Sequence, residues 1–207
     1  MSSKKLILSG IIPIFILGSI THFAYDWCSI TLLGLVAPIN SSIWEHMKMG
    51  LLPTIIWWGL TYLLFKNKLK LDFKRYFVAF TVSLLVSTFL MPFLYYTYRY
   101  GLGVHLLIVD ILNLLCTVTM GQLLALHIYN HYSWKKIYFN LCVIVLILVV
   151  LSFVIFTFNP PHIPIFKDYD TGTYEYIIDD KGNKLKFVIN KKIHCQKTRQ
   201  CIFNILP

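Results

Sequence analysis

The chain is poor in charged residues, and this shortage excludes most soluble folds. Only 14% of its 207 residues are charged, whereas 57% are hydrophobic and the mean hydropathy is +0.66. A soluble domain covers its surface with more charge, since average proteins contain about 25% charged residues. The composition therefore predicts a protein that uses a lipid bilayer as its solvent.

Acidic residues are especially few. The chain has nine Asp and Glu against 19 Lys and Arg, so its net charge is +10. Such an excess could indicate a nucleic-acid partner. Here, however, the basic residues lie between the apolar stretches, where they would face anionic lipid headgroups, or in a tail after residue 158. We therefore expect the lipid bilayer, and no nucleic acid, as the partner of these charges.

Several motifs are missing as well. None of the five cysteines has the spacing of a zinc finger or a redox pair. Cys195 and Cys201, in the tail, could form a disulfide if the tail is extracellular. The sequence contains no nucleotide-binding loop, kinase signature or nucleophile elbow, which argues against energy-driven transport and serine hydrolysis.

What the chain does contain is long apolar runs. A membrane-spanning helix needs about 20 apolar residues, and five stretches predict one: residues 6–24, 43–65, 76–98, 102–129 and 137–158. The short piece Ile30–Ile39 is interrupted by Gly34 and Pro38, so we expect a re-entrant or interfacial segment. The predicted fold is an all-α membrane domain over residues 1–158, followed by an extramembrane tail over 159–207. Two β-prone runs beside residues 179–183 predict a small β-hairpin there.

The basic residues predict the orientation of the chain in the cell membrane. Nine of them fall on the side of the N-terminus: Lys4, Lys5, Lys66, Lys68, Lys70, Lys74, Arg75, Lys135 and Lys136. The opposite short loops carry only Lys48 and Arg99. Because cytoplasmic loops are enriched in Lys and Arg, we expect a cytoplasmic N-terminus and an extracellular tail.

Polar residues gather at the predicted outer ends of the helices. His22 and Asp26 are four residues apart and share one helix face, with Gly18 one turn earlier. This spacing is typical of a metal site or of a histidine oriented by a carboxylate, but also of a polar helix end at the interface. Gly18 would let another backbone approach closely. His162, which follows two prolines, either reaches this cluster or is solvated.

Residues 40–48 are the most distinctive segment of the chain. Ser42 and Glu45 fit a capping box, in which both side chains satisfy free amides at the start of a helix. Glu45 therefore has a structural explanation as well as a possible catalytic one. His46 needs no such explanation and is the better functional candidate, while Asn40 is a further polar candidate.

The fourth predicted helix carries His105 near its start and a polar stripe. Asp110, Asn113, Thr117 and Gly121 recur at three- and four-residue steps, so they should face other helices or a water-filled cavity rather than lipid. A hydrogen bond to a serine of the preceding helix would explain Asp110 equally well.

Three segments also resemble a known family. They read H-F-x-Y-D-W at residues 22–27, N-S-S-I-W-E-H-M-K at 40–48 and N-P-P-H-I-P-I-F-K-D at 159–168. Over about residues 6–174 the chain resembles uncharacterised small integral membrane proteins of low-GC Gram-positive bacteria. The family pattern usually has glutamate where this chain has Ser41. The resemblance implies no established activity.

Histidines and carboxylates near one interface are ligands of the kind that bind zinc. One hypothesis is a metal-dependent hydrolase of a lipid or cell-envelope substrate, in which His22, His46 and His105 bind zinc, Asp26 orients His22, and Glu45 is the general base. A second is a protein that binds or transports a small ligand or ion. A third is an accessory subunit that docks on a membrane-protein partner or on a second copy of the chain.

Overall fold

The computed structural model describes residues 2–27, 31–131, 136–169, 172, 174, 177–178 and 184–185. Of residues 25–27, 31–32, 136–137, 177–178 and 184–185 it describes the backbone alone. These residues form α1 (Ser3–Leu8), α2 (Ile11–Trp27), α3 (Thr31–Gly34), α4 (Ile43–His46), α5 (Lys48–Phe65), α6 (Phe73–Tyr96), the π-helix η1 (Thr97–Gly101), α7 (Leu107–His131), α8 (Lys136–Phe158) and the 3-10 helix η2 (Pro164–Phe166).

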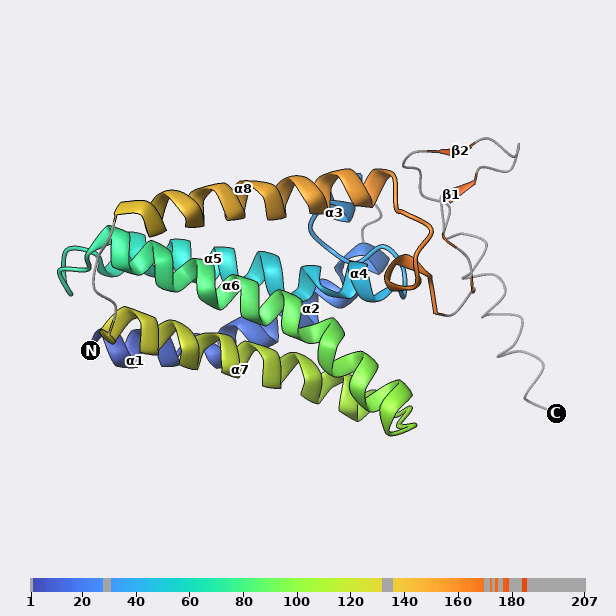
Figure 1. The fold of residues 1–207 in the computed structure, drawn as a ribbon, viewed down its shortest axis with the longest axis horizontal. Coiled ribbons are helices and arrows are strands. Elements are labelled where there is room, and N and C mark those ends of the chain that lie inside the picture. Colours follow the sequence, from blue (N-terminus) through green and yellow to red (C-terminus); the bar gives the residue numbers. More distant parts are fainter. Residues whose placement is uncertain are drawn as a thin grey trace.

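Five helical stretches are long and apolar enough to cross a membrane, as the apolar runs predict. They are Ser3–Ala24, Ile43–Phe65, Phe73–Gly101, Leu107–His131 and Tyr138–Phe158. The long helices run along the longest axis of the molecule, and the N-terminus lies at the end opposite to the end of α8 (Figure 1). The short helix α3 connects the first two stretches without crossing the bundle.

The predicted start of the fourth helix is wrong by about five residues. α6 continues into η1, and Gly103 then adopts a positive φ of 68°. The Val104 amide donates to the Tyr98 carbonyl at 3.0 Å, so the chain turns here and α7 begins only at Leu107. His105 therefore lies in a connecting loop and not on the helix that carries Asp110.

Small residues bring the helices into close contact. A Cβ atom on Gly18 of α2 would lie 2.7 Å from the Met49 carbonyl oxygen of α5, and one on Gly121 of α7 would lie 2.8 Å from the Ser83 carbonyl oxygen of α6. Neither position can hold a side chain unless a backbone moves. The close approach expected at Gly18 is confirmed.

The polar stripe of α7 faces the inside of the bundle, as its spacing predicts. Asn113 and Thr117 have exposed fractions of 8% and 0%, and Gln122, which follows the stripe residue Gly121, also has 0%. In the amide orientation that satisfies both ends of Gln122, its nitrogen donates to the Ile7 carbonyl at 3.1 Å. Its oxygen then accepts from Ser83 Oγ at 3.1 Å and from Trp58 Nε1 at 3.2 Å. This amide ties four helices together.

The described part of the tail is short. Residues Ile177–Ile178 (β1) and Lys184–Leu185 (β2) pair antiparallel, with Ile177 opposite Leu185. The connection between them lies outside the described residues, as do Cys195 and Cys201. The tail hairpin and the disulfide therefore stay predictions.

Candidate functional site

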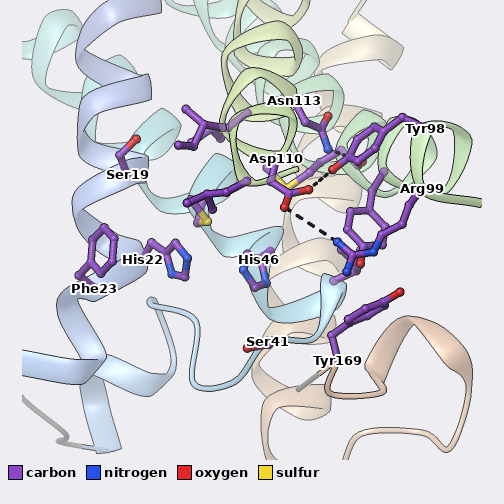
Figure 2. A pocket seen from close by; sticks show the side chains of 17 residues that line it. Ser19, His22, Phe23, Ser41, His46, Tyr98, Arg99, Asp110, Asn113 and Tyr169 are labelled. Carbon is purple, nitrogen blue, oxygen red and sulfur yellow. Dashed lines mark hydrogen bonds and ion pairs between the residues drawn. The ribbon is translucent and has the colours of Figure 1, made fainter. Parts of the chain in front are cut away.

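A cavity of about 550 Å³ opens at the end of the bundle where α2, α4 and α7 meet (Figure 2). We call it the polar cavity. Its polar lining comes from the start and end of several elements, and its apolar lining from the sides of α2, α5, α6 and α7. The lining residues are Ser19, His22, Phe23, Ser41, Ile43, His46, Met49, Met91, Tyr95, Tyr98, Arg99, Leu107, Asp110, Ile111, Asn113, Leu114 and Tyr169.

His22 and His46 lie next to each other on one side of the polar cavity. Their ring centroids are 5.1 Å apart at an interplanar angle of 68°. His46 is oriented by its own helix, because its Nδ1 lies 2.8 Å from the Ser42 carbonyl oxygen. His22 stacks on Phe23, and its buried Nδ1 has no hydrogen-bond partner among the described residues. The imidazole of His22 is thus available to a ligand.

Asp110 projects into the same cavity from the first turn of α7. The Tyr98 hydroxyl donates a short hydrogen bond to Asp110 Oδ1, and Arg99 Nη1 lies 3.9 Å from Asp110 Oδ2. The structure therefore partners this carboxylate with η1, and not with a serine of α6 as the sequence allowed.

Arg99 lies between aromatic rings. Its guanidinium carbon is 3.9 Å from the ring centroid of Tyr169 and 5.2 Å from that of Tyr95. Hydrogen bonds from Tyr100 and from the Arg99 guanidinium hold the pKa of the Tyr169 phenol below its ordinary value. Tyr169 follows η2, so the segment after α8 closes one wall of the cavity.

Asn113 lies one helical turn beyond Asp110, deeper in the bundle. Its Nδ2 donates to the Met91 carbonyl at 3.1 Å, whereas its buried Oδ1 accepts no hydrogen bond within the described part of the chain. An unsatisfied buried acceptor costs about 1–3 kcal/mol, so this oxygen favours a donor in the cavity.

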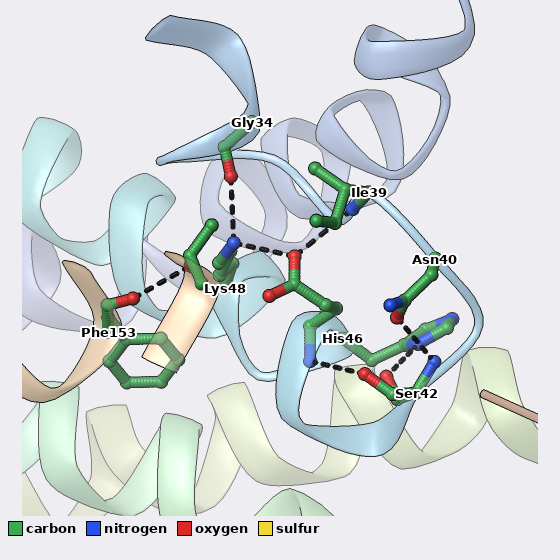
Figure 3. Close-up of polar contacts among 9 residues, drawn as sticks. Gly34, Ile39, Asn40, Ser42, His46, Lys48 and Phe153 are labelled. Atoms are coloured by element: carbon green, nitrogen blue, oxygen red, sulfur yellow. Dashed lines mark hydrogen bonds and ion pairs between the residues drawn. The ribbon is translucent and has the colours of Figure 1, made fainter. Parts of the chain in front are cut away.

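Glu45, the predicted general base, is not among the residues that line the polar cavity, and its carboxylate belongs to a buried ion pair. Its Oε2 lies 2.5 Å from Lys48 Nζ and accepts from the Ile39 amide at 3.1 Å, while Lys48 Nζ also donates to the Gly34 carbonyl at 2.8 Å (Figure 3). The side chains of Glu45 and Lys48 are 4% and 0% exposed. This buried ion pair fastens the α3–α4 connection to α5.

Only half of the predicted capping box is present. The Glu45 amide donates to Ser42 Oγ at 3.3 Å, as a capping box requires. The Ser42 amide, however, donates to Asn40 Oδ1 at 2.9 Å instead of to the Glu45 carboxylate. The reason is that Lys48 and Ile39 already hold this carboxylate, so Asn40 supplies the second cap.

The remaining predicted site residues are not brought into the cavity lining that the structure describes. His105 is exposed in the loop before α7, and His162 is exposed and stacks on Tyr174 with ring centroids 4.9 Å apart. Asp26 lies in the last turn of α2, but its side chain is outside the described part of the structure. Among the described side chains, no three His, Cys, Asp or Glu residues lie together as metal ligands would.

Sequence reasoning missed the aromatic and basic part of the cavity. Tyr98, Arg99 and Tyr169 form part of its wall, yet the sequence identifies Arg99 only as a charge in a loop. The available signal was the run of tyrosines around a single arginine at residues 95–100, in a region with almost no other charge.

The fold and this cavity define a class: an α-helical, multi-pass membrane protein with a polar pocket at one end of its bundle. The chain belongs to the family of unknown function DUF6512, whose family model matches residues 1–176. This agrees with the resemblance to an uncharacterised family, and the match ends before most of the basic tail. No curated protein matches the chain, and no solved structure matches it.

Proposed function

We propose that the polar cavity binds a small amphipathic molecule. The observation that carries this proposal is the set of buried polar atoms without partners among the described residues that line one apolar-walled cavity: His22 Nδ1, Arg99 Nε and Asn113 Oδ1. Burying such atoms without partners destabilises a fold. A ligand in the cavity would supply hydrogen-bond partners for all three atoms.

The size and lining of the cavity support the same function. Ligand pockets have volumes of about 300–1,000 Å³ and are mostly apolar with a few polar groups, and the polar cavity has about 550 Å³. Met49, Met91 and Leu114 offer an apolar wall, while the histidines and Arg99 are polar. A molecule with an apolar chain and a polar head matches both.

The distribution of basic residues favours an orientation in which this cavity lies on the outer side of the cell membrane. The N-terminus would then be cytoplasmic and the tail extracellular. If the chain comes from a Gram-positive bacterium, as the motif resemblance implies, the ligand would be a lipid or a cell-envelope molecule.

Methionine methyl groups provide a direct test. The chain has five methionines, of which Met49 and Met91 line the polar cavity and Met120 does not. With ¹³C-methyl methionine in phosphatidylcholine nanodiscs, we would titrate three probes of equal chain length: decanol, decyl phosphate and decyltrimethylammonium. We expect at least one probe to shift the Met49 and Met91 resonances saturably, while Met120 stays in place.

A pair of variants controls this test. Ser19→Phe fills the cavity from α2, and Ser152→Phe places the same side chain on α8 outside it. Both serines donate to the carbonyl four residues earlier, at 2.9 and 2.8 Å, so the two variants lose the same local bond. The shifts should vanish only in Ser19→Phe. The proposal is wrong if no probe causes saturable shifts. It is also wrong if the shifts persist in a folded Ser19→Phe protein.

A metal-dependent hydrolase is the second candidate, supported by the contact between His22 and His46. A third ligand would have to come from outside the described side chains, and Asp26, one helical turn beyond His22, is the candidate. Mass spectrometry of the purified protein should then find about one zinc per chain, as a catalytic site requires, and none after His22→Ala or His46→Ala. Metal-free wild-type protein would exclude this candidate.

A further inference from the structure

Arg99 is the only described cation among the residues that line the polar cavity, histidines aside. Its side chain is 16% exposed, and its buried Nε has no partner among the described residues. A guanidinium carries five N–H donors. Because no described residue accepts a hydrogen bond from Nε, at least this donor of Arg99 remains for a ligand.

Asp110 does not satisfy these donors. Its Oδ2 is 3.9 Å from Arg99 Nη1, which is longer than a hydrogen bond. Its Oδ1 is already bonded to the Tyr98 hydroxyl. Asp110 therefore offsets the charge of Arg99 at a distance but leaves room for a second acceptor close to the guanidinium.

The two rings that flank Arg99 are not an open site for a cationic head group. Tyr95 and Tyr169 present their faces, but the Arg99 guanidinium already covers both rings. A second cation would meet Arg99 at short range and would be repelled. The unpartnered Nδ1 of His22 can donate a proton to an anion in one of its tautomers.

We propose that Arg99 anchors an oxyanion head group, so that the ligand of the polar cavity is an anionic amphiphile carrying a phosphate or carboxylate. This inference rests on the proposed binding function and narrows its ligand. Arginine binds such groups through two parallel N–H donors. The apolar chain would lie along Met49, Met91 and Leu114, which line the cavity beyond the polar groups.

The same nanodisc titration tests this assignment at neutral pH. A hydrogen bond to a charged group changes affinity by about tenfold to a hundredfold. We therefore expect decyl phosphate to bind about tenfold or more tightly than decanol, and decyltrimethylammonium to bind most weakly. Inorganic phosphate is titrated separately. If inorganic phosphate causes saturable shifts and decyl phosphate does not, the ligand is a free anion and the proposal of an amphiphilic ligand is wrong.

Two variants separate charge from geometry. Arg99→Gln should remove the preference for decyl phosphate while decanol still shifts Met49 and Met91. Arg99→Lys keeps the charge without the planar fork and should keep part of the preference. Equal affinities of all three decyl probes for the wild-type protein would overturn the anionic ligand and leave the binding function intact. If none of the three decyl probes causes saturable shifts, the proposed binding function itself is wrong.

Discussion

The ion pair between Glu45 and Lys48 allows a prediction that separates a structural role of Glu45 from a catalytic one. Both side chains are almost fully buried, at 4% and 0% exposure, and Nζ lies 2.5 Å from Oε2. Removing one partner of a buried pair leaves an uncompensated charge and costs about 3–5 kcal/mol. We expect that loss for Glu45→Gln and also for Lys48→Met.

The double variant should be more stable than either single variant. In Glu45→Gln/Lys48→Met no buried charge remains, and the glutamine oxygen can still accept from the Ile39 amide. The Gly34 carbonyl, now 2.8 Å from Lys48 Nζ, loses its donor, which costs about 1–3 kcal/mol. The two substitutions should therefore couple by several kcal/mol instead of adding.

The assay is unfolding in mixed micelles with increasing dodecyl sulfate, followed by far-UV circular dichroism. Lys68→Met serves as the matched control, because Lys68 is exposed in the loop before α6 and its removal should leave the unfolding midpoint unchanged. A Glu45→Gln protein with wild-type stability would refute the reasoning and restore Glu45 as a candidate general base. Additive effects of the two single substitutions would refute the pairing itself.

Two further predictions concern the packing of the bundle and use the same assay. Gly121→Ala should cost about 1–3 kcal/mol as an overpacked site, since its Cβ would lie 2.8 Å from the Ser83 carbonyl oxygen. Gly59→Ala, with nothing within 4 Å, should be neutral or stabilising, and equal effects of both would contradict the close approach. Gln122→Leu should lower the free energy of unfolding by about 1–3 kcal/mol, because the indole N–H of Trp58 and the hydroxyl of Ser83 lose their acceptor. Unchanged stability would contradict the hydrogen bonds of the Gln122 amide.

The helices could be predicted because each apolar run is long enough to cross a bilayer on its own. The ends of these helices are predicted less accurately, because a helix end depends on local backbone geometry. The sequence predicts a break between residues 98 and 102 but not its length, because hydropathy does not show where helical geometry ends and resumes. The positive φ of Gly103 and the bond from the Val104 amide end that stretch and delay α7 until Leu107.

Part of the candidate site can be predicted from the sequence. His22, His46, Asp110 and Asn113 line one cavity because helix periodicity and topology place them at one end of the bundle. The capping box gives Glu45 a structural explanation but gives no sign of Lys48, whose side chain turns back into the fold and donates to the Glu45 carboxylate.

The burial of Lys48 also bears on the predicted orientation. The orientation rule counts Lys and Arg that stay in the cytoplasm, and its two exceptions in the short loops are Lys48 and Arg99. Lys48 is fully buried beside a carboxylate, and Arg99 lies between Tyr95 and Tyr169 within reach of Asp110. Each exception thus has a structural reason to lie on the tail side, so neither opposes the predicted placement of the polar cavity at the outer face.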